Sequence, residues 1–130
     1  MTSEAAFVLD ASALMALLNE EPGSSAVEAL LDGAVISSVN WCEAFGKLRA
    51  RGLEATGITT NMDGTRIEIL AFDEIDARTA GELTMRTRSA GLSLADRACL
   101  ALASRLGVPA VTADRAWTTL DVGVEIVCIR

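Results

Sequence analysis

Histidine is missing from this sequence of 130 residues. Its absence excludes Ser-His-Asp and Cys-His catalysis, zinc sites built on imidazole, and a histidine general base. The groups left for chemistry are carboxylates, because 18 residues are Asp or Glu. Carboxylate oxygens are the ligands that hard cations such as Mg²⁺ and Mn²⁺ prefer. Catalysis by this chain is therefore expected to rely on acidic residues and a divalent cation.

Cysteine pairs and membrane segments are missing as well. Cys42, Cys99 and Cys128 are widely spaced and form no CxxC pair, so we expect neither disulfides nor a cysteine-ligated zinc. The N-terminus has no basic region, and Asp10 interrupts the first apolar run, so we expect no signal peptide. With 51% hydrophobic residues the chain can bury a core. We expect one domain over residues 1–130, in a soluble cytoplasmic protein without membrane contact.

Lysine is nearly missing, since Lys47 is the only one among 11 basic residues. The net charge of −7 argues against a broad surface for nucleic acid, although it leaves room for a local one. The remaining basic residues are arginines, which suit bidentate contacts to phosphate or carboxylate groups.

Apolar runs alternate with helical patterns along the chain. Residues 5–9 are typical of a strand buried on both faces of a parallel sheet. Further strands are predicted at residues 34–36, 67–72, 110–112 and 124–129. Helices are predicted at residues 13–18, 24–31, 39–51, 73–88, 94–106 and 114–120, with a weak one at 58–66. This alternation predicts an α/β fold with a parallel or mostly parallel sheet of four or five strands, covered on both faces.

Four acids recur where a strand ends or a helix begins: Asp10, Glu43, Asp96 and Asp114. In a parallel α/β sheet these places lie along the edge where ligands bind. Each acid also has a structural explanation, because acids cap helices and are favoured in their first turns. If the four converge, their mutual repulsion calls for a divalent cation, which could activate water for phosphodiester hydrolysis.

Four segments around these acids resemble the acidic motifs of the PIN-domain nucleases, and in particular the VapC-type ribonuclease toxins. The segments are residues 8–14, 38–43, 92–96 and 111–117. The resemblance implies a five-stranded parallel sheet in a three-layer α/β/α sandwich. It also implies cleavage of RNA, with tRNA as one candidate, that depends on Mg²⁺ or Mn²⁺. A partner antitoxin and a homodimer are implied in the same way.

The resemblance also assigns roles to individual residues. Asp10, Glu43 and Asp96 match the principal metal-binding acids of the family, and Asp114 matches its fourth, more variable acid. Ser12 and Thr112 match small hydroxyl residues that support the site in many members. No motif acid is replaced, which argues against a non-catalytic PIN-like module that only binds a partner.

Other residues have two interpretations. Arg97 and Arg115 each follow a proposed ligand and could contact RNA phosphates, or they could be ordinary surface residues. Trp41 and Trp117 could stack on bases, although their helical spacing favours a place in the core. Apolar residues in the stretch 14–31 could exceed what a small domain buries, which would favour a subunit or antitoxin interface. A phospho-acceptor receiver-like domain is disfavoured, because it needs a lysine near the last strand.

Overall fold

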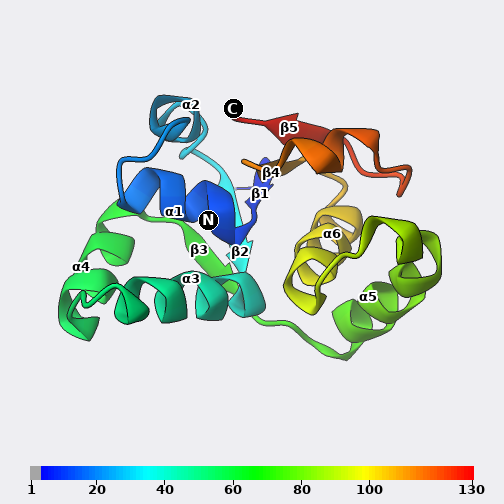
Figure 1. The fold of residues 1–130 in the computed structure, drawn as a ribbon, viewed down its shortest axis with the longest axis horizontal. Helices are drawn as coiled ribbons and strands as arrows, with labels where there is room; N and C mark the ends of the chain where they lie inside the picture. The colour runs from blue at the N-terminus through cyan, green and yellow to red at the C-terminus, as the bar shows by residue number, and fades with distance from the viewer. Residues whose placement is uncertain (1–3) are drawn as a thin grey trace.

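Five short parallel strands form the centre of the structure, a computed structural model that describes residues 4–130. The strands are β1 (Phe7–Leu9), β2 (Ala34–Ser37), β3 (Glu68–Leu70), β4 (Ala110–Thr112) and β5 (Ile126–Cys128). Their order across the sheet is β3-β2-β1-β4-β5, and every neighbouring pair is parallel. The carboxyl end of β1 therefore lies in the middle of the sheet edge (Figure 1).

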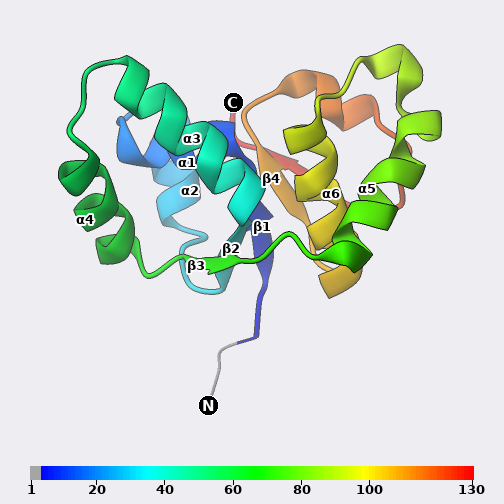
Figure 2. The ribbon, with the colours of Figure 1, turned by 90° about the horizontal axis from the view of Figure 1, so that it is seen from below.

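Helices cover both faces of this sheet. The longer helices are α1 (Ala11–Leu18), α3 (Ser38–Ala50), α4 (Ala55–Thr65), α5 (Glu74–Arg86) and α6 (Leu94–Leu106). The short ones are α2 (Ser24–Glu28) and the 3-10 helices η1 (Arg88–Ala90) and η2 (Arg115–Thr119). Figures 1 and 2 show α1 to α4 on one side of the sheet and α5 and α6 on the other. The three-layer α/β/α sandwich predicted from the sequence is confirmed, with five strands.

Successive strand residues face different cores, because side chains alternate along a strand. Leu9 and Ile36 pack with residues of α1 to α4, whereas Val8 and Val35 pack with residues of α5 and α6. All four side chains are at most 4% exposed. Burial on both faces is the reason that β1 is a continuous apolar run.

Helix α4 is the main correction to the predicted elements. The sequence predicts only a weak helix at residues 58–66, whereas α4 is a regular helix of 11 residues. Ile58 and Met62 lie one turn apart and pack into the core. The residues that weaken the pattern, Asn61 and Asp63, lie on its exposed face.

Smaller differences concern the ends of elements. The helix predicted to reach residue 88 ends at Arg86, and η1 follows after Thr87. The strands predicted at residues 67–72 and 124–129 are shorter, at three residues each. Among residues 4–130, none of the helices has the length and apolar character needed to cross a membrane.

The apolar residues of the stretch 14–31 pack in the core of the domain or against it. Leu14 and Val27 are fully buried, and Leu18, Leu30 and Leu31 pack partly buried against the same core. These partly buried leucines keep part of their surface exposed, so an interface formed by this stretch stays a prediction. The homodimer stays a prediction as well.

Candidate active site

A small pocket of about 170 Å³ lies at the carboxyl edge of the sheet. Its lining includes Asp10, Glu43, Asp96 and Asp114. Asp10 follows β1, Asp114 follows β4, and the other two lie in the early turns of α3 and α6. The structure thus gathers the four predicted acids around one cavity, which we call the acidic pocket.

Asp10 is the buried member of this set, with only 5% of its surface exposed. Its Oδ1 accepts hydrogen bonds from Ser12 Oγ (2.7 Å) and the Ala13 amide (2.8 Å), and its Oδ2 accepts one from Thr112 Oγ1 (2.6 Å). Burial raises the pKa of Asp10, the three hydrogen bonds oppose that rise, and the negative charge of Asp96 adds to it. A buried carboxylate is therefore held in one orientation by donors from two strand ends.

The two hydroxyl residues predicted to support the site both contact Asp10, and they also bind backbone on the β4 side. Ser12 Oγ accepts a hydrogen bond from the Ala113 amide (2.9 Å), and Thr112 Oγ1 accepts one from the Asp114 amide (3.0 Å). The loop after β1 and the loop after β4 are consequently fixed to each other. This network sets the position of Asp114 relative to Asp10.

Helix capping, the structural explanation for these acids, is also present. Asp10 caps α1, Asp114 Oδ1 accepts from the Ala116 amide (2.9 Å), and Asp96 forms a reciprocal capping box with Ser93. Each of the latter two caps uses one carboxylate oxygen. Asp96 Oδ1 and Asp114 Oδ2 accept no hydrogen bond from residues 4–130. Capping therefore orients these side chains and leaves an oxygen of each available for a ligand.

A hydrogen bond between helices on opposite sides of the sheet sets the position of Glu43 relative to Asp96. Asn40 Nδ2, on the first turns of α3, donates to the backbone oxygen of Ala95 in α6 (3.0 Å). The Asn40 side chain is 1% exposed, so the bond lies in a place shielded from water. Glu43 lies three residues after Asn40 on α3, and Asp96 is the residue after Ala95 on α6.

Lys47 is the residue of the acidic pocket that the sequence did not reveal. It lies one turn after Glu43 on α3, and its Nζ is 3.3 Å from Glu43 Oε2. Residues four apart share one face of a helix, so the spacing was the available signal. Among residues 4–130, the single lysine of the chain is thus the only cation in the lining of this pocket.

The donor set of the pocket fits a hard divalent cation. The negative charge of Asp96 already raises the pKa of Asp10, and a dication would offset this repulsion. Within residues 4–130, no three acidic or thiol side chains are grouped closely enough to form a metal cage by themselves. Mg²⁺ commonly keeps several waters and binds through one or two carboxylates, so it needs no tighter cage.

The two arginines predicted to lie beside the acids do not line the acidic pocket. Arg97 Nη1 donates to the backbone oxygen of Ala80 and to Thr84 Oγ1, both at 2.9 Å and both on α5. Arg115 Nε donates to the backbone oxygen of Arg130 (3.3 Å). Successive helical residues point roughly 100° apart, so a residue next to a pocket acid faces elsewhere. Proximity in sequence was misleading here, and any contact of these arginines with RNA stays a prediction.

The tryptophans are core residues, as their spacing favours. Trp117 is 1% exposed and packs with the residues that cover the α6 side of the sheet. Trp41 is half-buried and its ring meets Phe45 edge-on, with centroids 5.5 Å apart. Trp117 also contributes to the wall of the acidic pocket, but its burial leaves little ring surface on which a base could stack.

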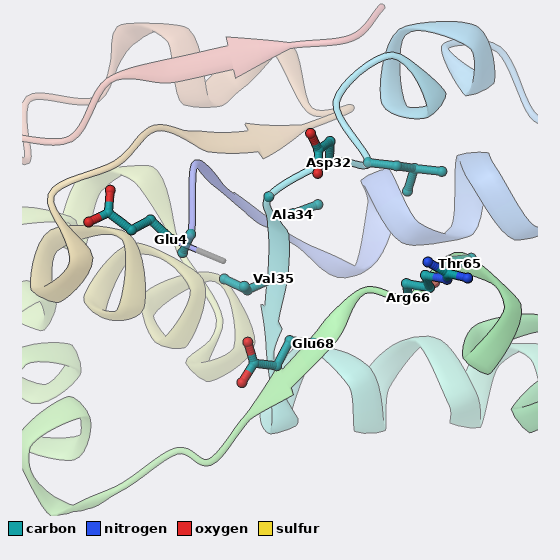
Figure 3. A pocket seen from close by; sticks show the side chains of 10 residues that line it. Glu4, Asp32, Ala34, Val35, Thr65, Arg66 and Glu68 are labelled. Atoms are coloured by element: carbon teal, nitrogen blue, oxygen red, sulfur yellow. The ribbon is translucent and has the colours of Figure 1, made fainter. Parts of the chain in front are cut away.

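A second acidic cavity lies at the opposite, amino end of the strands, with a volume of about 310 Å³. Glu4, Asp32 and Glu68 line it together with Arg66. Figure 3 shows these carboxylates coming from separate segments and lying apart from one another. All three are exposed, and no residue in 4–130 donates a side-chain hydrogen bond to them. The amino-end pocket therefore lacks a buried, oriented carboxylate.

Comparisons with known proteins agree with this architecture. A toxin–antitoxin complex from Klebsiella pneumoniae is similar, with a TM-score of 0.75 and 19% identity over 96% of this chain and 98% of that chain. DNA-bound VapBC from Salmonella typhimurium is similar with a TM-score of 0.75 and 20% identity, over 97% of this chain and 99% of that chain. VapBC-5 from Mycobacterium tuberculosis has a TM-score of 0.60 and 25% identity, over 95% of this chain and 98% of that chain. Comparison with curated proteins gives no match.

The model of the PIN domain matches residues 7–122 of the sequence. That range contains all four acids of the pocket as well as Ser12 and Thr112. The match extends over most of the chain, and so the chain belongs to the PIN domain family.

Proposed function

We propose that this chain is a metal-dependent endoribonuclease and the toxin of a toxin–antitoxin pair. The observation that carries the nuclease proposal is the convergence of Asp10, Glu43, Asp96 and Asp114 on one pocket. Membership in a family of nucleases supports it. The absence of histidine fits the same chemistry, since hydrolysis assisted by a metal ion needs no imidazole and no covalent intermediate.

In this proposal the four acids would hold Mg²⁺ or Mn²⁺, one or two of them directly and the others through bound waters. The ion would lower the pKa of a water and stabilise the leaving oxygen. Asp10 is the rigid member, because Ser12 and Thr112 hold both of its oxygens in place. Lys47 supplies a positive charge in the same pocket, where its ammonium group can bind an oxygen of the substrate phosphate.

An antitoxin is the proposed partner, because similar solved structures are toxin–antitoxin complexes. RNA, with tRNA as a candidate, is the proposed substrate, and the cytoplasm is the proposed place of action. A homodimer remains part of the prediction.

The nuclease proposal is tested with purified protein, total RNA and tRNA. Cleavage is expected with Mg²⁺ or Mn²⁺ and is expected to stop when EDTA is added. Asp10→Asn should abolish cleavage while changing the free energy of unfolding by only about 1 kcal/mol, because Asn caps a helix about as well as Asp. Asp32→Asn, in the amino-end pocket, is the matched control and should cleave normally. Cleavage by Asp10→Asn that resists EDTA would contradict the proposal.

The toxin proposal has a separate test in growing cells. Expression of this chain alone should arrest growth, and co-expression of the small reading frame next to its gene should restore growth. Asp10→Asn should not arrest growth in either case. Equal growth arrest with and without the neighbouring frame would contradict the toxin proposal.

A further inference from the structure

A third pocket lies on the other side of the first turn of α6, with a volume of about 260 Å³. The residues that line it are Thr84, Thr87, Arg88, Gly91, Leu92 and Arg97. In the described part of the chain, two guanidinium groups and no carboxylate line it. In a protein with a net charge of −7, this basic pocket contrasts with the acidic pocket beside it.

The guanidinium group of Arg97 is fixed before any ligand arrives. Its Nη1 donates to the backbone oxygen of Ala80 and to Thr84 Oγ1 on α5. Arg carries five N–H donors, and those on Nε and Nη2 have no acceptor among residues 4–130. A cation held in place with donors to spare loses little conformational entropy when it binds an anion.

Arg88 adds a second cation from η1. The turn that carries it is fixed by Thr87, whose hydroxyl donates to the backbone oxygen of Leu83 (2.7 Å) and which is 3% exposed. No acid in the described part of the chain lies within ion-pair distance of Arg88 or Arg97. The positive charge of the basic pocket is therefore not neutralised by the protein itself.

The basic pocket adjoins the acidic one along the chain. Asp96 lines the acidic pocket and Arg97, the next residue, lines the basic pocket. The first turns of α6 therefore contribute a side chain to both pockets.

We propose that the basic pocket binds a backbone phosphate of RNA that flanks the phosphate to be cleaved. This inference rests on the proposed nuclease function. The fork of a guanidinium group matches two oxygens of one phosphate, and contacts to phosphate fix the register of the chain without reading bases. The pocket supplies the local attraction for RNA that the overall charge of the protein does not.

The test compares Arg88→Ala with Arg78→Ala. Both variants remove one positive charge from exposed positions, but Arg78 is paired with Glu74 on α5 and does not line the basic pocket. We expect Arg88→Ala to raise KM for a long single-stranded RNA by about tenfold, the effect of losing a hydrogen bond to a charged group, with kcat unchanged. The slope of log affinity against log salt should fall by about 0.7, as for one phosphate contact on a single strand.

Substrate length provides the internal control. A dinucleotide with the same scissile step has no flanking phosphate, so Arg88→Ala should cleave it like the unaltered protein. Equal effects of the two variants on the long RNA, or equal effects of Arg88→Ala on both substrates, would overturn the proposal. Binding of poly-glutamate that depends on Arg88, without a change in RNA binding, would also overturn it and indicate an acidic peptide.

Failure of this inference can be told apart from failure of the nuclease function. Fluorescence anisotropy of labelled RNA in EDTA measures binding in the absence of metal. If no metal supports cleavage but RNA binding still depends on Arg88, the nuclease proposal fails and the basic pocket stands. If the protein cleaves RNA and Arg88→Ala behaves like Arg78→Ala in both measurements, the basic pocket fails and the nuclease proposal stands.

Discussion

The two ends of the sheet carry acidic pockets of different construction. The amino-end pocket is larger, at about 310 Å³ against about 170 Å³, yet Asp32 and Glu68 are exposed there. At the carboxyl end Asp10 is 5% exposed and accepts three hydrogen bonds. Exposed charges are hydrated at little cost, whereas a buried charge needs compensating partners. Burial and orientation of a carboxylate, rather than the size of a cavity, therefore distinguish the end of the sheet suited to chemistry.

The largest expected effect is a difference in RNA cleavage between variants at the carboxyl end and variants at the amino end of the sheet. Asp96→Asn should lower kcat/KM for RNA by more than about 100-fold, because changes that merely touch a metal ligand indirectly already cost roughly 10- to 100-fold. Asn can still accept the capping hydrogen bond from the Ser93 amide, so the fold should persist. Glu68→Gln in the amino-end pocket should change nothing. Similar losses of kcat/KM in both variants, measured on the same RNA, would show that the two ends of the sheet do not differ in this way.

A second, smaller effect tests the orientation of Asp10. Thr112→Val removes the donor to Asp10 Oδ2 and the acceptor of the Asp114 amide. The free energy of unfolding should fall by about 1–3 kcal/mol, because buried polar groups lose their partners. Since the Thr112 hydrogen bond lowers the pKa of Asp10, its loss should move the acidic limb of the pH–rate profile to higher pH.

Thr112→Ser is the rescue control for this variant, because it keeps the hydroxyl group. It should retain the pH–rate profile of the unaltered protein. If Thr112→Val and Thr112→Ser have the same profile, the hydroxyl group does not tune Asp10.

A third prediction concerns stability against pH in the absence of divalent cations. The pKa of Asp10 is raised above its ordinary value of 3.8 by burial, so the folded state binds the proton more tightly than the unfolded state. Ionisation of Asp10 therefore costs stability as pH rises from 3.8 through the raised pKa. Asp10→Asn lacks this cost, so its stability relative to the unaltered protein should grow over that range.

Chemical unfolding at a series of pH values measures this difference. Asp32→Asn, at an exposed position, is the control for removal of one carboxylate. A stability difference between Asp10→Asn and the unaltered protein that stays constant with pH would show that burial does not destabilise the charged form of Asp10.

The smallest expected effect comes from Lys47. An exposed ion pair between residues four apart on a helix contributes about 0.3–0.5 kcal/mol, so the Glu43–Lys47 pair should yield readily to a metal ion. Lys47→Met removes this competition and should raise the affinity for Mn²⁺ by about twofold, the equivalent of that energy. Titration calorimetry on the metal-free protein measures the change, with Arg49→Met on the same helix as control. A lower affinity in Lys47→Met would show that the lysine does not compete with the ion.

The sequence predicted the acids because their places follow from general rules. An acid directly after a parallel strand, such as Asp10 or Asp114, lies at the carboxyl edge whatever the details of packing. Acids in the first turns of α3 and α6 face the same edge once these helices pack on opposite sides of the sheet. The hydrogen bonds to Asp10 were less accessible, because they depend on the pairing of Leu9 with Val111 between β1 and β4.

The sequence was least informative about the direction in which each helical side chain points. Lys47 resembles an ordinary surface residue until its face is matched to that of Glu43. Arg97 follows Asp96 but is bound to α5. In α4, Ile58 and Met62 form the buried face, which the polar residues between them obscured. In each case tertiary contacts, rather than local pattern, decide the outcome.

The hydrogen bond from Thr112 to Asp10 has a consequence for synthesis of the protein. It joins residues 102 positions apart, and the ribosome makes the second of them late. A nascent chain that stalls before β4 contains Asp10, Glu43 and Asp96 but lacks both the hydroxyl that orients Asp10 and the carboxylate of Asp114. Aborted translation products therefore carry an unfinished pocket, and a cell meets the assembled one only after β4 has left the ribosome.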